Sequence, residues 1–174
     1  RFHREHRFPA TVAVTPLGDR DPRQFGVVEA NENWQIVGFE EKPSHPRGEW
    51  ASMGIYVFRR DILTRLLRED AADPESQHDF GKNIFPRLIR IADVGAYVFD
   101  GYWQDIGTVA AFYEANMKLL DPGHIDAVTS TEWPIRTPSV DAPPARVVSG
   151  GRVTRSLLAN GAVQWNAAQR DASY

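Results

Sequence analysis

Apolar residues in the first hundred positions fall into short runs separated by charged or turn-forming residues. Runs of this length, rich in Val, Ile, Phe and Tyr, predict β-strands. The predicted strands cover residues 10–14, 25–29, 34–39, 52–58 and 96–99. Asn31-Glu32-Asn33 separates the second run from the third, and this spacing predicts a hairpin.

Helical patterns alternate with these strands. The charged residues 1–7 are typical of the end of a helix, Asp61 can cap a second helix, and Thr108 can cap a third. The apolar positions that share one face are Ile62, Leu63, Leu66 and Leu67 in the second helix, and Phe112, Ala115, Leu119 and Leu120 in the third. Strands mixed with helices indicate an α/β fold.

The composition changes after Leu120, where five prolines fall between positions 122 and 144. Proline at this density is typical of an extended linker. Beyond it, Val147 and Val153 are six residues apart, as are Leu157 and Val163, with glycines between them, which suggests short β-helix coils. The predicted division is therefore residues 1–120, a linker at 121–146, and residues 147–174.

Composition narrows the possible functions. The 174 residues are 42% hydrophobic and 25% charged, which is typical of a globular protein. Twenty basic and 23 acidic residues give a net charge of −3, so we expect no nucleic-acid partner. Without cysteine the chain has no disulfide, thiolate zinc site or cysteine nucleophile, and no apolar run approaches the length that predicts a membrane-spanning helix.

Glu41-Lys42-Pro43 is the first segment that suggests chemistry. Pro43 favours extended backbone at the preceding residue, which would place Lys42 at the end of a strand. An ammonium there suits a phosphate, and a neighbouring carboxylate can accept hydrogen bonds from sugar hydroxyls. The alternative is a charged hairpin end in solvent.

Two further segments have both a structural and a functional interpretation. Ser52 and Gly54 begin a strand with a small hydroxyl and a glycine, which indicates either a bulge or the close approach of a ligand. Asp79 precedes a predicted helix, where it can cap the helix or contact a ligand.

Tyr102 to Thr108 ends a predicted strand with Asp105 and leads into a helix. Ligands of α/β folds bind where strands end, and a carboxylate there can hold a divalent cation such as Mg²⁺. Gly107 would let the backbone approach closely. The alternative interpretation is a plain capping turn before the helix.

Taken together, these segments resemble glucose-1-phosphate adenylyltransferase, a family of sugar-nucleotide enzymes of glycogen synthesis. The resemblance covers residues 8–165 and rests on segments in the family's order: residues 25–27, 39–43, 51–58, 78–82, 102–108 and 133–137. It implies the C-terminal half of a Rossmann-like nucleotidyltransferase domain, a mixed sheet with helices, followed by the start of a left-handed β-helix.

The resemblance also implies a role for particular residues. Glu41 and Lys42 would bind the sugar phosphate, and Asp105 would be one of two Mg²⁺-binding aspartates. The remaining residues implied in sugar binding, with Gly26 near the sugar or the base, are Gly26, Ser52, Tyr56, Asp79, Phe80 and Trp103.

The implied reaction transfers AMP from ATP to glucose 1-phosphate and releases pyrophosphate, in a cytoplasmic, allosteric homotetramer. The family's glycine-rich loop and second aspartate would precede Arg1, so we expect a piece of a longer protein that is inactive alone. Such a piece would expose apolar strand residues, namely Val12, Val14, Ile55, Val57 and Phe58. The alternatives are a sister enzyme for another sugar 1-phosphate or nucleotide, and a non-catalytic regulatory subunit.

Overall fold

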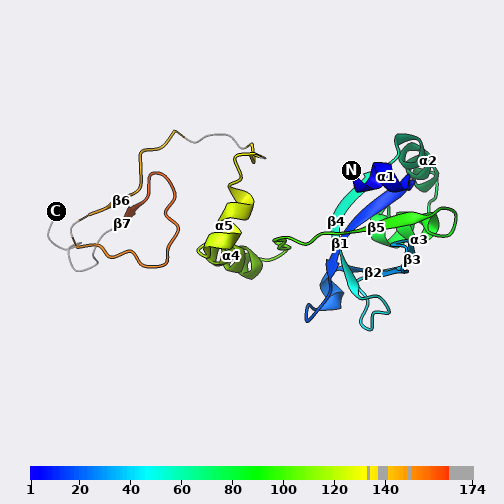
Figure 1. The fold of residues 1–174 in the computed structure, drawn as a ribbon, viewed down its shortest axis with the longest axis horizontal. Helices are drawn as coiled ribbons and strands as arrows, with labels where there is room; N and C mark the ends of the chain where they lie inside the picture. Colours follow the sequence, from blue (N-terminus) through cyan, green and yellow to red (C-terminus); the bar gives the residue numbers. More distant parts are fainter. Residues whose placement is uncertain (133, 137–140, 149, 165–174) are drawn as a thin grey trace. The chain divides into compact units, whose positions relative to one another are not determined.

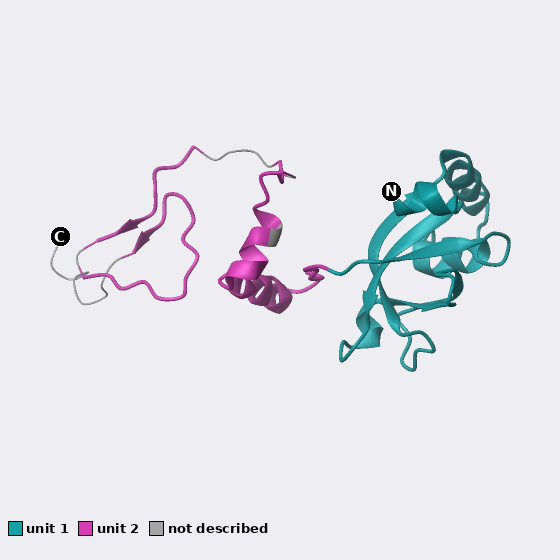
Figure 2. Cartoon of the chain, in the orientation of Figure 1, with its two compact units in different colours: residues 1–100 teal, residues 101–174 magenta. Residues whose placement is uncertain are grey.

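A computed structural model describes residues 1–132, 134–136, 141–148 and 150–164. The chain forms two compact units, residues 1–100 and 101–174, which Figure 2 shows in different colours. Each unit is described below by itself. Trp133, Thr137 and the tail from Trp165 to Tyr174 lie outside the described residues.

Unit 1 contains a five-stranded mixed sheet in the order β3-β2-β4-β1-β5 (Figure 1). The strands are β1 (Ala10–Pro16), β2 (Gly26–Ala30), β3 (Ile36–Glu41), β4 (Trp50–Phe58) and β5 (Val94–Val98). β1 and β5 are parallel, and the β1–β4, β2–β3 and β2–β4 pairs are antiparallel. The predicted hairpin and the predicted α/β class are therefore confirmed.

Helical segments pack against this sheet. They are α1 (Phe2–His6), η1 (Pro22–Gln24), α2 (Arg60–Ala71), the π-helix η2 (Phe80–Ile84) and α3 (Phe85–Leu88). Leu66 of α2 and Phe85 and Leu88 of α3 are fully buried with Val12 and Val14 of β1. This core fixes α2 and η2 on the sheet.

Two expectations about unit 1 are wrong. Asp61 does not cap α2, because Arg59 holds the N-cap position and the Asp61 carboxylate pairs with the Arg59 guanidinium at 2.7 Å. Val12 and Val14 are fully buried, because the helices cover their side chains, and Phe58 is half-buried. Ile55 and Val57 are exposed as expected, with 53% and 48% of their surface accessible.

Unit 2 contains α4 (Val109–Lys118), α5 (Pro122–Val128) and the short parallel strands β6 (Arg146–Val147) and β7 (Val163–Gln164). The predicted strand at 102–105 is wrong, because residues 101–107 follow an irregular path. Ala115 is buried, but Phe112 is 58% exposed, contrary to its helical pattern. α5 lies within the range predicted as a linker. No helix in the described part of the chain is long and apolar enough to cross a membrane.

Candidate functional site

The open end of the β2–β3 hairpin forms the first part of the candidate site. Gly26 begins β2 and pairs in register with Glu41, which ends β3. The Lys42 amide donates to the Phe25 carbonyl at 2.9 Å and closes this end of the hairpin. Lys42 then turns the chain with φ 51°, so the prediction of extended backbone there is wrong.

Two glycines make room for the Glu41 carboxylate. A Cβ added to Gly81 would lie 2.2 Å from Glu41 Oε2, and one added to Gly26 would lie 3.1 Å from the same atom and 2.7 Å from the Phe39 ring. A side chain at Gly81 would therefore displace the carboxylate. The Glu41 carboxylate thus occupies space that exists because both residues are glycine.

Asp79 contributes a second carboxylate to the same region. Its side chain accepts a hydrogen bond from the Lys82 amide at 2.9 Å. Asp79 therefore caps η2, which is one of the two roles predicted for it. Burial, followed by the negative charge of Asp79, raises the pKa of Glu41, while the positive charges of Lys42 and Lys82 lower it. Asp79 is thus close enough to Glu41 for their charges to interact.

β4 contributes hydroxyl groups. The register with β1 shifts between Val12 and Val14, opposite Gly54, which has φ 71°, so Gly54 marks an irregularity of the bulge type that was predicted. The Ser52 hydroxyl accepts a hydrogen bond from the Gly54 amide at 3.3 Å, and burial raises the pKa of Tyr56, while the nearby Ser52 hydroxyl lowers it. The Phe80 ring stacks on Tyr56 with centroids 5.6 Å apart.

Unit 1 therefore gathers the residues of the sugar cluster, which we define as Gly26, Glu41, Lys42, Ser52, Tyr56, Asp79 and Phe80. Carboxylates and hydroxyls can bind sugar hydroxyls, and an ammonium can bind a phosphate. Sequence reasoning gave no role to Gly81 or Lys82, although both lie in the quoted segment 78–82 and their spacing from Asp79 would have pointed to them.

Trp103 and Asp105 belong to unit 2. Asp105 is exposed on the irregular segment before α4, and Gly107 has room for a Cβ 3.5 Å from Asp105 Oδ2. The cap of α4 is Thr108, whose hydroxyl accepts a hydrogen bond from the Ala111 amide at 3.1 Å. Asp105 is therefore not the residue that caps this helix.

The donor set around Asp105 limits what metal it can hold. Among the described residues, no group of three or more His, Cys, Asp or Glu side chains is placed to bind a metal ion. Mg²⁺ is commonly held by one or two carboxylates together with substrate phosphates and water. A single exposed carboxylate fits one ligand of such a site.

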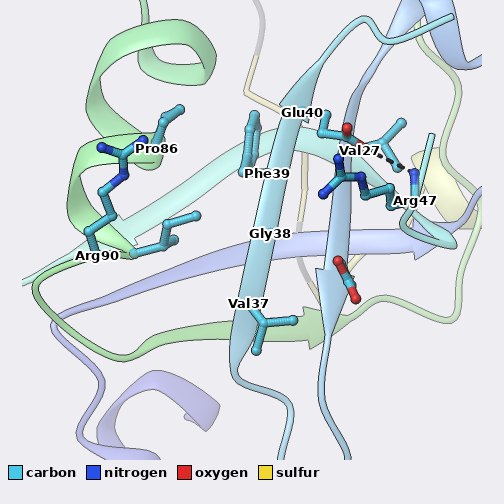
Figure 3. Close-up of a pocket in the computed structure, with 10 residues that line it drawn as sticks. Val27, Val37, Gly38, Phe39, Glu40, Arg47, Pro86 and Arg90 are labelled. Carbon is cyan, nitrogen blue, oxygen red and sulfur yellow. Dashed lines mark hydrogen bonds between the residues drawn. The ribbon is translucent and has the colours of Figure 1, made fainter. Parts of the chain in front are cut away.

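A separate cavity lies beside β3. Its volume is about 240 Å³, and it is lined by residues of β2, β3 and α3 and by Arg47, whose amide donates to Glu40 Oε2 at 2.9 Å (Figure 3). Arg47 and Arg90 both line it and lie on opposite sides of β3 in this view. None of the residues of the sugar cluster lines it.

Known proteins match the part of the chain that contains these residues. The sequence model of a family described as nucleotidyl transferase matches residues 1–122. The chain belongs to this family. The matched range contains the whole of unit 1 together with Asp105 and α4.

Curated relatives make the likeness more specific. The chain is 47% identical over 161 residues to the glucose-1-phosphate adenylyltransferase of Thermomicrobium roseum, and 38% identical over 163 residues to that of Thermotoga maritima. Each match covers 92% of this chain and 38% of the relative. The resemblance predicted from the sequence is thus confirmed, and the chain spans less than half the length of these relatives.

Proposed function

We propose that this chain is the sugar-phosphate-binding part of a glucose-1-phosphate adenylyltransferase. The observation that supports this most directly is the sugar cluster, in which the ammonium of Lys42 lies near Glu41, and the charges of Glu41 and Asp79 act on each other and on Tyr56. The reaction would join AMP from ATP to glucose 1-phosphate and release pyrophosphate, supplying ADP-glucose for α-glucan synthesis.

Within this proposal, Lys42 binds the phosphate of the sugar. Its Nζ lies 3.9 Å from Glu41 Oε1, and 59% of its side chain is exposed, so it can reach a ligand while Glu41 keeps it near the cluster. Glu41 and Asp79 accept hydrogen bonds from sugar hydroxyls, and Ser52, Tyr56 and Phe80 shape the pocket. Family resemblance adds Trp103 as a further sugar-binding residue, and Gly26 leaves room near the sugar or base.

The attacking group in this reaction is a phosphate oxygen that is already anionic at neutral pH. A strong general base is therefore unnecessary, and the rate enhancement comes from alignment and from stabilising charge on the phosphates. Lys42 would orient the attacking phosphate. A site built from a lysine and hydrogen-bond acceptors, without a strong general base, agrees with this mechanism.

Asp105 is the proposed ligand of Mg²⁺, which would neutralise developing charge on the transferred phosphate. The carboxylate of Asp105 would hold the cation through one oxygen. Other proposals that rest on family resemblance are a β-helix that begins near β6, a homotetramer, and a cytoplasmic location.

The test is a chimaera in which this chain replaces the matching part of the Thermomicrobium roseum relative. Pyrophosphate release is measured with ATP, Mg²⁺ and a panel of sugar 1-phosphates: glucose, galactose, mannose and N-acetylglucosamine. We expect turnover with glucose 1-phosphate and at least about tenfold lower kcat/KM with the others, because one mispaired buried polar group costs about 1–3 kcal/mol. The unmodified relative is the positive control.

The same panel separates the alternatives. A preference for another sugar 1-phosphate would identify a sister enzyme and contradict the proposal. A folded chimaera without turnover on any sugar, which still binds glucose 1-phosphate, would favour the regulatory subunit. A folded chimaera that neither binds nor turns over a sugar phosphate would refute both.

A further inference from the structure

The loop between α2 and η2 is tied back onto α2 by one buried carboxylate. Asp70 lies in the last turn of α2 and is only 8% exposed. Its Oδ1 accepts a hydrogen bond from the Ser76 hydroxyl, and its Oδ2 lies 2.8 Å from His78 Nδ1. Both partners belong to the loop that leads to Asp79.

The backbone of the loop joins the same set of bonds. The His78 amide donates to Ser76 Oγ at 3.0 Å, so the Ser76 hydroxyl both donates and accepts. The three groups form a closed ring of hydrogen bonds, which we call the Asp70 clip: Asp70, Ser76 and His78. It holds His78 at φ 56°, a left-handed conformation that residues with a side chain rarely adopt.

The clip ends one residue before the sugar cluster. Asp79 follows His78 directly and caps η2, and Phe80, the first residue of η2, stacks on Tyr56. The direction in which the chain leaves His78 therefore sets where the Asp79 carboxylate and the Phe80 ring lie. Lys42, which directly follows Glu41, also has a left-handed conformation, with φ 51°. Each carboxylate of the cluster thus has a left-handed residue beside it.

Asp70 also borders a cavity of about 460 Å³, together with Asp73, Asn83 and Arg87. Ser52, Tyr56 and Glu41 do not line that cavity. The Asp70 clip reaches the cluster through residues 76–79. The same cavity is lined by Asn83, whose Oδ1 accepts a hydrogen bond from the Asp79 amide at 3.3 Å, and by Lys82, whose charge lowers the pKa of Glu41.

We propose that Asp70 is a positioning residue for sugar-phosphate binding: through Ser76 and His78 it fixes the loop that presents Asp79 and Phe80 to the sugar. This inference rests on the proposed function, because it assigns a task within the same site. A purely structural carboxylate would stabilise the end of α2 without changing how the sugar binds.

The test uses the chimaera with Asp70→Leu, which fills the space without accepting hydrogen bonds, and Asp70→Asn. The Asn amide oxygen can accept from Ser76, and its NH₂ can donate to neutral His78 Nδ1. We expect Asp70→Leu to raise the KM for glucose 1-phosphate about tenfold and to leave the KM for ATP within about twofold. Asp70→Asn should restore most of the loss. Asp61→Leu, an exposed carboxylate at the other end of α2, is the matched control.

A second measurement does not depend on turnover. Contacts between the Phe80 and Tyr56 rings are observed by nuclear Overhauser effects in residues 1–174. We expect these contacts to disappear in Asp70→Leu and to persist in Asp70→Asn and Asp61→Leu. An inactive chimaera would count against the proposed function alone, because the ring contacts still report on the clip.

Two results would overturn the inference. One is a lower thermal midpoint for Asp70→Leu with an unchanged KM for glucose 1-phosphate, which would show a structural role only. The other is a Phe80–Tyr56 contact that survives loss of the clip. Ser76→Ala combined with Asp70→Leu should add little to the single change, because both remove the same hydrogen bond.

Discussion

The sugar cluster and the Asp105 segment hold their polar groups in different ways. In the cluster, the Glu41 carboxylate is half-buried in space left by Gly26 and Gly81, and Asp79 is fixed as the cap of η2. Asp105 is exposed on irregular backbone between unit 1 and α4. Packing therefore pre-organises the groups proposed for the sugar, whereas the proposed metal ligand depends on a ligand or cation to complete its surroundings. The two regions should respond differently to substitution.

The largest effect should come from Asp105. Asp105→Asn keeps the shape of the side chain and removes the charge, and metal stabilisation of a transferring phosphate is worth several kcal/mol. We expect kcat to fall about 100-fold or more at saturating Mg²⁺, while the KM for glucose 1-phosphate changes little. Steady-state kinetics of the chimaera measure this. Asp100→Asn, on the same exposed segment, is the control, and near-normal turnover of Asp105→Asn would rule out the metal role.

Lys42 should show the opposite division between the kinetic constants. A charge-assisted hydrogen bond contributes about 1.5–3 kcal/mol, so Lys42→Ala should raise the KM for glucose 1-phosphate about 10- to 150-fold. The KM for ATP should barely move. Arg47→Ala, an exposed cation on the same loop, should have little effect. Equal changes for both substrates would contradict the assignment.

Substitution of Gly81 tests whether the space beside it determines the position of the Glu41 carboxylate. The Cβ of Gly81→Ala would lie 2.2 Å from Glu41 Oε2, so the carboxylate must move. Loss of one sugar hydrogen bond should raise the KM for glucose 1-phosphate about tenfold. Gly123→Ala is the control, because nothing lies within 4 Å of its added Cβ. If Gly81→Ala and Gly123→Ala give the same KM for glucose 1-phosphate, the space at Gly81 does not determine the position of the Glu41 carboxylate.

Removal of the Tyr56 hydroxyl should have a smaller effect. Tyr56→Phe keeps the ring that stacks on Phe80 and loses the hydroxyl that interacts with Ser52 and that would bind the sugar. A neutral hydrogen bond contributes about 0.5–1.5 kcal/mol, so we expect a two- to tenfold higher KM for glucose 1-phosphate. Tyr97→Phe, at an exposed tyrosine of β5, should leave the KM unchanged. An equal effect of both variants would show that the hydroxyl has no specific role.

The pH dependence of sugar binding should separate the two regions further. Burial and then Asp79 raise the pKa of Glu41, and the Glu41 carboxylate accepts hydrogen bonds from sugar hydroxyls more strongly when it is deprotonated. As pH falls, binding of glucose 1-phosphate should therefore weaken at a higher pH than the pKa of an ordinary glutamate would predict. Isothermal titration calorimetry across this range measures it. Asp79→Asn removes the repulsion and should move the weakening to lower pH.

The sequence predicted the members of the sugar cluster better than their conformations. Their positions beside a strand end or a helix start make Glu41, Lys42 and Asp79 candidates, and the family resemblance assigns them to sugar binding. The left-handed backbone of Lys42 was missed, because Pro43 favours extended geometry there and the closure of the hairpin onto Phe25 overrides that preference. A tertiary hydrogen bond of this kind leaves no local pattern.

Other errors have the same origin. Asp61 has the residue type of a cap, but Arg59 occupies the N-cap position and the Asp61 carboxylate, two residues later, pairs with the Arg59 guanidinium. Tyr102 to Asp105 has the composition of a strand, yet a strand also needs a neighbour to pair with, and residues 101–107 are irregular in the structure. The local sequence does not show that Gly81 and Lys82 lie beside Glu41, because only the folded η2 places them there.

The turn of the β2–β3 hairpin has a consequence for self-association. Trp34 accepts a hydrogen bond from the Ala96 amide at 2.8 Å, and Gln35 bridges to Gly95, so the turn covers part of the outer edge of β5. Uncovered strand edges template pairing between molecules. Shortening the turn would expose the edge of β5 and would also shift the β2–β3 hairpin. We expect copies of the chain to pair through this exposed edge and to associate.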